Sequence, residues 1–182
     1  MGVSGSGKST LARYIAEQIG ANYLEADDYH PPENIALMRG GTPLTDTDRE
    51  PWIQALCRKI KPATSNIVMA YSGLKYEHRR RFQELGKPCL FLKLNISRNG
   101  VEARLARRAG HFMPSSLIAS QFESLEAIRS NEPVKEIDSD VNLEQVQRAA
   151  MKHVESFMAA PELFNSSYKT ENMRVNHDDI ET

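Results

Sequence analysis

Residues 2–10 read Gly-Val-Ser-Gly-Ser-Gly-Lys-Ser-Thr and stand at the very start of the chain. They fit the pattern G-x-x-x-x-G-K-[ST], in which backbone N–H groups and a lysine surround nucleotide phosphates. Gly2, Gly5 and Gly7 allow backbone conformations that a Cβ atom disfavours, so that consecutive N–H groups can point toward phosphate oxygens. The pattern therefore predicts a nucleotide-binding loop. Its residues are Gly2, Val3, Ser4, Gly5, Ser6, Gly7, Lys8, Ser9 and Thr10.

Two side chains of this loop have a predicted chemical role. The Lys8 ammonium is expected to bridge the β- and γ-phosphates, and the Ser9 hydroxyl to bind the Mg²⁺ that accompanies the nucleotide. Leu11, Ile15 and Ile19 then recur at the spacing of one helix face, which puts the phosphates at a helix N-terminus, where the dipole favours anions. Two simpler interpretations are a Gly/Ser-rich turn and an N-myristoylation pattern, and the loop accounts for more of the residues than either.

Length and composition narrow the class of protein. A chain of 182 residues fits one domain that buries roughly 70% of its unfolded surface. The net charge of −1 gives no electrostatic reason to expect a nucleic acid or an anionic membrane as partner. The longest apolar stretch, 89–92, is interrupted by Lys93, and no signal peptide precedes the loop, so we expect a cytoplasmic protein. Cys57 and Cys89 lack the spacing of a zinc site or a disulfide framework.

Short apolar runs alternate with helical patterns along the chain. The predicted strands span 22–25, 67–71, 89–94 and 134–137, and the predicted helices span 8–19, 47–60, 75–85, 97–109, 115–125 and 143–159. This alternation predicts an α/β fold with a parallel sheet flanked by helices on both faces. We expect one domain over 1–160 and a mobile tail over 161–182, where periodicity stops.

The helix predicted over 47–60 has a clear buried stripe. Trp52, Leu56 and Ile60 are spaced four residues apart, as neighbours on one helix face are. Asp46 or Thr47 is the expected N-cap, because short polar side chains favour that position.

An acidic segment follows the first predicted strand. Residues 25–31 read Glu-Ala-Asp-Asp-Tyr-His-Pro, and open α/β sheets bind ligands at the carboxyl ends of their strands. One carboxylate here can accept a proton from a hydroxyl nucleophile, and another can hold Mg²⁺ through water. The alternative is a solvated acidic turn. His30 is either a substrate contact or a structural hydrogen-bond partner.

Arginines of the predicted helix 97–109 are candidates for contacting phosphates. Arg104 and Arg108 are four residues apart and face the same way. A lid over about residues 108–120 would bring both to the transferred phosphoryl group, whose charge they would neutralise. The alternative is a stripe of solvated surface arginines.

Arg49 lies in a charged segment at the start of another predicted helix. A guanidinium can clamp a substrate carboxylate through two parallel hydrogen bonds. An ordinary ion pair with Asp46 or Glu50 explains the same residue types equally well, and both interpretations stay open.

These motifs together resemble the gluconokinase family of small sugar-acid kinases, over residues 2 to about 157. Phosphate loops occur in many unrelated proteins, whereas Asp-x-Asp-Arg-x-Pro-Trp at 46–52, Gly-His-Phe at 110–112 and Gln-Phe-Glu at 121–123 are specific in this order. The resemblance implies a P-loop kinase fold similar to shikimate and adenylate kinases. It also implies ATP-dependent phosphorylation of D-gluconate to 6-phospho-D-gluconate, with Mg²⁺, by a homodimer.

The resemblance also assigns roles to single residues. It implies ATP contacts from the phosphate loop, a Mg²⁺ ligand in Ser9, a catalytic carboxylate near the acceptor hydroxyl, two lid arginines, a loop under the adenine, and further substrate contacts. The catalytic carboxylate is Asp27, and the two lid arginines are Arg104 and Arg108. Asp140 lies in the loop under the adenine. The further substrate contacts are His30, Arg49, Ser72 and His111.

The sequence departs from the family pattern in three places. The usual Cys-Ser-Ala-Leu-Lys is Tyr-Ser-Gly-Leu-Lys at 71–75, which is expected to put a bulky ring and a flexible glycine beside the substrate pocket. The segment 161–182 has no counterpart in the family, and the strand that normally leads into the phosphate loop is missing. We therefore expect four strands, a gap or an imperfect closure between 67–71 and 89–94, and a phosphate loop held only by its helix.

Two other functions stay open. One is a kinase for another small polyol acid, such as shikimate. The other is a truncated, catalytically poor isoform that acts as a binding or dimerising module.

Overall fold

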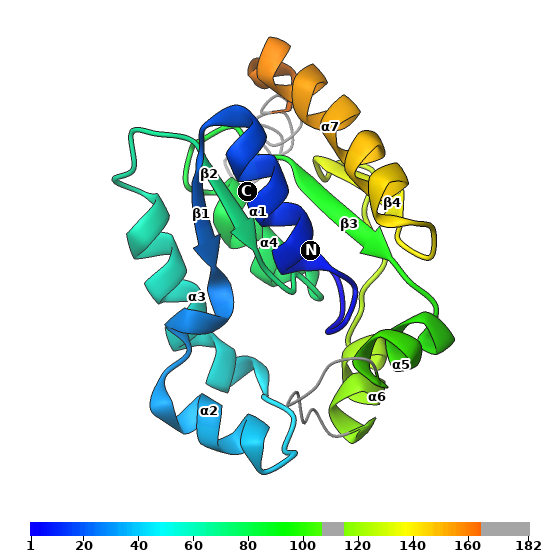
Figure 1. Cartoon of the computed structure of the whole chain (residues 1–182). Coiled ribbons are helices and arrows are strands. Elements are labelled where there is room, and N and C mark those ends of the chain that lie inside the picture. Colours follow the sequence, from blue (N-terminus) through cyan, green and yellow to red (C-terminus); the bar gives the residue numbers. More distant parts are fainter. Residues whose placement is uncertain (107–114, 165–182) are drawn as a thin grey trace, which may run out of the picture.

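The structure is a computed structural model that describes residues 1–106 and 115–164 (Figure 1). Its elements, in chain order, are α1 (Lys8–Ile19), β1 (Asn22–Glu25), η1 (Ala26–Tyr29), α2 (Pro32–Arg39), α3 (Asp46–Ile60), β2 (Ile67–Ala70), α4 (Tyr76–Gln83), β3 (Phe91–Asn95), α5 (Arg98–Ala106), α6 (Ser115–Glu123), β4 (Val134–Asp138), α7 (Leu143–Ala159) and η2 (Pro161–Phe164). All four predicted strands and all six predicted helices are present. The bounds of β1, α1 and α7 are those predicted, and the other elements have shifted ends, with residues 107–109 of the helix predicted over 97–109 outside the described residues.

Three short helices were not predicted from the sequence, namely α2 and the 3-10 helices η1 and η2. Helix α2 begins with Pro32 at its first position and buries only Asn34, so it lacks the apolar stripe that marks a helix. The 3-10 helix η2 occupies the start of the segment expected to form a tail, where Phe164 packs edge-on against Phe157 at a ring distance of 5.1 Å. Residues 165–182 lie outside the described residues.

The strands form two separate parallel pairs. Strand β1 pairs with β2, with Asn22 opposite Ile67, and β3 pairs with β4, with Phe91 opposite Val134. Each pair is a two-stranded sheet, and no strand of the described residues joins β2 to β3. The prediction of a gap between these two strands is therefore confirmed.

Helices cover both faces of the two strand pairs, as Figure 1 shows. Alternate residues of a strand point to opposite faces. Val68 and Leu92 pack into a core cluster formed with α1 and α7, whereas Met69 and Phe91 pack into a second cluster formed with α3 and α4. Both faces are thus buried, which is typical of parallel sheets.

Helix α3 is fixed at its N-terminus by a cap that differs from the prediction. Thr45, and neither Asp46 nor Thr47, is the N-cap: its Oγ1 accepts from the Asp48 N–H at 3.2 Å, and the Asp48 carboxylate accepts from the Thr45 N–H at 2.8 Å. This reciprocal pair is a capping box, which satisfies two N–H groups together. Trp52 and Leu56 are buried as predicted.

Candidate phosphate and substrate site

The phosphate loop has the backbone geometry expected of an anion cradle. Gly5 and Gly7 have φ angles of 79° and 99°, in the left-handed region that residues with a Cβ rarely adopt. Gly7 is also the N-cap of α1, and it has no side chain that could cap the first-turn N–H groups of that helix. These donors, with the positive end of the helix dipole, suit a nucleotide phosphate. The loop thus fits ATP with its Mg²⁺.

The loop is held on both sides, contrary to the prediction that only its helix would hold it. On the N-terminal side, Gly2 N–H donates to the Ser72 carbonyl and Leu94 N–H donates to the Met1 carbonyl, both at 2.9 Å. Within the loop, the Ser4 N–H donates to the Gln121 side-chain oxygen of α6 at 2.6 Å. These bonds join residues that are distant in the sequence, so a local sequence motif cannot predict them.

Lys8 lies over the loop that it belongs to. Its ammonium nitrogen donates to the Val3 carbonyl at 2.9 Å. This contact spans the backbone turn that the glycines form, so the ammonium is held across that turn. Ser9 follows at the start of α1, and its hydroxyl interacts with Tyr23, whose own hydroxyl donates to Glu25. The structure therefore links Ser9 to the acidic end of β1.

Arg104 of α5 contacts the phosphate loop. Its guanidinium donates to the Ser6 carbonyl at 2.9 Å and to the Ser139 hydroxyl at 3.1 Å, and it also contacts the Ser139 carbonyl. A cavity of about 310 Å³ lies here, lined by Gly5, Thr10, Arg104 and Ser139 among others. Arg104 therefore joins α5 to the phosphate loop and to the segment after β4, and its contact with a phosphate stays a prediction.

Asp140 follows Ser139 beside this cavity, but its side chain is already engaged. One carboxylate oxygen accepts from the Ser97 N–H at 2.8 Å, at the start of α5. The carboxylate therefore ties the segment after β4 to α5. A contact with adenine at this position stays a prediction.

Asp27 and His30 lie close together after β1. Asp27 is in η1 with its side chain 72% exposed, and one of its carboxylate oxygens is 4.0 Å from His30 Nε2. The carboxylate is thus open to an incoming substrate hydroxyl. Nothing in its contacts separates a catalytic role from the solvated acidic turn.

His30 has a structural partner and an unusual charge state. Its ring stacks on Trp52 with centroids 4.1 Å apart and planes 15° apart. Burial, and then the charge of Arg49, lowers the pKa of His30 to about 4, so the imidazole is neutral near pH 7. The Asn34 amide nitrogen lies 3.4 Å from Nδ1. If Asn34 donates there, the ring proton is on Nε2, the nitrogen that faces Asp27.

A cluster of cationic and imidazole groups surrounds Asp46. Lys75 donates to this carboxylate at 2.6 Å, Arg49 lies 3.4 Å from it, and His78 Nε2 lies 3.8 Å from it. The hydrogen bond from Lys75 is the main cause that lowers the pKa of Asp46. The ion-pair interpretation of Arg49 is therefore correct for this structure. Lys75 and His78 follow β2 in the chain. The sequence did not predict that they lie beside Asp46 and near Arg49.

Ser72 lies between β2 and this cluster, where its carbonyl holds Gly2. The neighbouring Tyr71 corrects a prediction, because its ring points into the core and not into the substrate pocket. It packs against Trp52 and Phe82, with ring centroids 5.3 Å and 5.0 Å away, and burial raises the pKa of its phenol. Trp52 thus contacts both the Tyr71 ring and the His30 ring.

Several predicted site features lie outside the described residues. These are Arg108, His111 and most of the lid predicted over 108–120. Among residues 1–106 and 115–164, no group of three or more His, Cys, Asp or Glu side chains is arranged to hold a metal ion. In the same ranges, no helix is long and apolar enough to cross a bilayer.

Comparisons with known proteins agree with this geometry. The family model of the AAA domain matches residues 1–133. The gluconokinase of Gluconobacter oxydans (strain 621H) is 38% identical over 160 residues, which cover 86% of this chain and 89% of that protein. The thermoresistant gluconokinase of Escherichia coli (strain K12) is 39% identical over 80% of this chain and 86% of its own length.

Solved structures lead to the same family. A crystal structure of a gluconokinase from Sinorhizobium meliloti 1021 superposes with a TM-score of 0.81 at 38% identity, covering 91% of this chain and 94% of that one. A shikimate kinase from Aquifex aeolicus vf5 superposes with a TM-score of 0.58 at 15% identity, covering 85% of this chain and 94% of that one, which shows a common fold alone. The chain therefore has the P-loop kinase fold.

Proposed function

The chain belongs to the gluconokinase family, and on that premise we propose that it transfers the γ-phosphoryl group of ATP to a hydroxyl of D-gluconate, giving 6-phospho-D-gluconate. The observation that carries the proposal is the phosphate loop, with left-handed Gly5 and Gly7 and the Lys8 ammonium held over Val3. Phosphoryl transfer depends mainly on positioning and on stabilising charge, and this loop supplies both.

On the nucleotide side, the loop N–H groups and Lys8 bind the phosphates, and Arg104 adds a second positive charge beside Ser6. Ser9 is the proposed ligand of Mg²⁺, which neutralises phosphate charge when bound. We propose Arg108 as a further charge that contacts the transferred group, and the segment at Asp140 as the loop under the adenine.

On the acceptor side, Asp27 is the proposed general base for the attacking hydroxyl. Neutral His30 can donate a hydrogen bond to a substrate hydroxyl through Nε2. The cluster around Asp46 holds more positive than negative groups, so Arg49 is the proposed partner of the sugar-acid carboxylate. Ser72 and His111 are proposed as further substrate contacts.

We test the reaction by measuring ADP release from purified protein with D-gluconate, shikimate and related polyol acids. The expected result is release that depends on D-gluconate and on Mg²⁺. Release with shikimate and not with D-gluconate would favour the alternative acceptor. No release with any acid, together with retained ATP binding, would favour a binding or dimerising module.

We also propose a homodimer located in the cytoplasm. The support is membership in the family, since no partner chain is described. Light scattering after size-exclusion chromatography measures the mass, and a monomer at micromolar concentration would contradict the dimer.

A further inference from the structure

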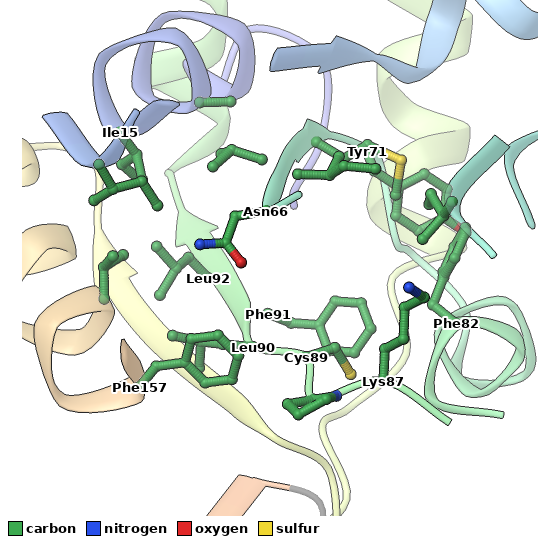
Figure 2. Close-up of a pocket in the computed structure, with 18 of the residues that line it drawn as sticks. Ile15, Asn66, Tyr71, Phe82, Lys87, Cys89, Leu90, Phe91, Leu92 and Phe157 are labelled. Carbon is green, nitrogen blue, oxygen red and sulfur yellow. The ribbon is translucent and has the colours of Figure 1, made fainter. Parts of the chain in front are cut away.

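The Lys8 side chain borders a cavity. This cavity, of about 540 Å³, lies between β2 and β3, and Lys8 is among the residues that line it. Its walls are mostly apolar, and Figure 2 shows Tyr71 just after β2, Leu92 on β3 and Phe157 on α7 around it. Close packing therefore does not fix the Lys8 side chain on this side. The position of its ammonium group depends on the groups that accept hydrogen bonds from it.

One of those acceptors belongs to a peptide group that is bound at both ends. The Val3 carbonyl accepts from the Lys8 ammonium at 2.9 Å and from the Ser6 N–H at 3.2 Å. The Ser4 N–H belongs to the same peptide group, and in a planar trans peptide the carbonyl and the N–H point in opposite directions. That N–H donates to the side-chain oxygen of Gln121 at 2.6 Å. Gln121 thus fixes one end of the peptide group whose other end contacts Lys8.

Helix α6 holds Gln121 on a firm support. Just beyond the helix, the Glu126 N–H donates to the Leu74 carbonyl at 2.9 Å, and the Glu126 carboxylate accepts from the Tyr76 N–H at 2.6 Å. Phe122, next to Gln121, packs against a buried cluster that includes a residue of the phosphate loop. The Gln121 oxygen is therefore placed by contacts that do not involve Lys8.

The hydrogen-bonding groups involved define what each contact can do. The Ser4 N–H can bond only to the oxygen of the Gln121 amide, so this contact sets the orientation of the amide. An ammonium group has three donors, so Lys8 can keep the Val3 carbonyl while its other donors contact phosphate oxygens. If the peptide group turned over, its carbonyl would point away from the ammonium. The contact with Gln121 opposes that rotation.

We propose that Gln121 is a positioning residue for Lys8 and acts through the Val3–Ser4 peptide group. This role rests on the proposed transfer of the γ-phosphoryl group of ATP. By holding the peptide group in one orientation, Gln121 places the ammonium for the β- and γ-phosphates before the nucleotide binds. A charge that is already in place stabilises the transition state without reorganisation during the reaction.

The test is a double-mutant cycle of the parent protein, Gln121→Met, Lys8→Ala and the double variant. Methionine is close to glutamine in length but lacks the amide oxygen. We expect Gln121→Met to lower kcat by roughly 10–100-fold and to raise the Kd of ATP by roughly 3–10-fold, because it misplaces a catalytic group. In the Lys8→Ala background, the same substitution should change neither quantity by more than about twofold, since residues that act as a unit are not additive.

Three measurements follow these effects. Transfer of labelled γ-phosphate to D-gluconate detects slow turnover, titration calorimetry gives the Kd of ATP, and hydrogen exchange reports on the Ser4 amide. Exchange at Ser4 should become at least about tenfold faster in Gln121→Met. Calorimetry and exchange need no acceptor, so the cycle remains readable on ATP affinity even if the proposed reaction with D-gluconate fails.

Ser120→Ala is the matched control on the same helix. The Ser120 hydroxyl donates to the Leu117 carbonyl within α6 at 2.9 Å, so its removal should leave kcat, ATP affinity and Ser4 exchange close to those of the parent. If Gln121→Met does not fold, Gln121→Ala removes the same oxygen and takes its place in the cycle.

Two results would overturn the positioning role. An equal loss of ATP affinity from Gln121→Met with and without Lys8 would show that Gln121 acts on the nucleotide directly. Parent-like ATP affinity and kcat in Gln121→Met would show that the peptide group needs no support from α6.

Discussion

Lys8 offers the most direct test of the nucleotide site. We expect Lys8→Ala to lower kcat by at least about 10²-fold, because the variant lacks a preorganised positive charge at the transferred phosphate. Its melting temperature should change little, since the substitution removes a part-buried hydrogen bond to the Val3 carbonyl. Steady-state kinetics and thermal denaturation measure the two effects.

Lys87→Ala is the matched control for this variant. Lys87 also donates to a backbone carbonyl, that of Ala63 at 2.6 Å, but far from the loop in sequence. Equal loss of kcat in both variants would contradict the assignment of Lys8.

Asp27→Asn separates a general base from a metal ligand. We expect kcat to fall by roughly 10²–10⁴ while ATP affinity stays nearly unchanged, as for loss of a general base. Asp28→Asn, on the adjacent exposed residue, should leave kcat close to that of the parent protein. A variant at Asp27 that loses ATP affinity but keeps kcat would assign the carboxylate to Mg²⁺.

The lowered pKa of His30 predicts how the free energy of unfolding depends on pH. Its folded pKa of about 4 lies below the unfolded value of 6.5, so the unfolded chain binds more protons between these values. Stability is therefore full above pH 6.5 and falls as the pH drops toward 4. We expect His30→Gln to reduce this fall by about 1–3 kcal/mol.

Urea denaturation at pH 7 and pH 4.5 measures that difference. His153→Gln on α7 serves as control, because His153 has no contact with the Trp52 stack and its pKa is lowered mainly by weaker burial. If the parent and His30→Gln lose equal stability on acidification, the ring is not held neutral.

Motif reasoning found the residues of the loop because their spacing is fixed within nine positions. It did not find Lys75 and His78 beside Asp46, since these side chains meet only after β2 and α4 pack against α3. Tyr71 shows the same limit: its place in the sequence suggested the pocket, whereas packing against Trp52 and Phe82 turns it into the core.

Among the elements, α4 is held by a buried ion pair. Arg79 and Glu132 are both fully buried at their side chains, and Arg79 also donates to the carbonyls of Gly73 and Leu74. We expect Arg79→Met to destabilise the protein by roughly 3–5 kcal/mol, because it leaves a buried carboxylate without its cation. Denaturant unfolding measures this change.

The double variant Arg79→Met/Glu132→Gln is the informative comparison. It removes both charges, so it should recover part of the stability that the single variant loses. Arg80→Met, which breaks exposed pairs with Glu77 and Glu84, should cost at most about 1 kcal/mol. Equal losses in Arg79→Met and Arg80→Met would contradict the role of burial.

Periodicity predicted the longer elements well, since α1, α3 and α7 each have an apolar face. It did not predict α2, whose first residues are typical of a proline turn. The sequence also did not predict the residue that caps α3. Thr45 is the cap because its hydroxyl and the Asp48 carboxylate bond each other's N–H groups, a choice that composition alone leaves open among several polar residues.

For the molecule as a whole, the two strand pairs and the nucleotide site are mechanically joined through Met1 and Gly2. If only part of the ensemble holds the loop in a binding-competent form, the apparent ATP affinity falls by that fraction.

The fold class followed from the alternation of strands and helices, and the gap followed from the position of the loop at the start of the sequence. The hydrogen bonds of Met1 with β3 could not be predicted, because they depend on the positions of the two strand pairs relative to Met1.

The stack of His30 on Trp52 has a practical consequence. Trp52 is the chain's single tryptophan, so its fluorescence comes from one known place. Indole emission responds to the polarity and the ring contacts around it. A ligand that touches His30 therefore acts on a built-in optical reporter, and occupancy of the acceptor side can be followed in real time without a label and without turnover.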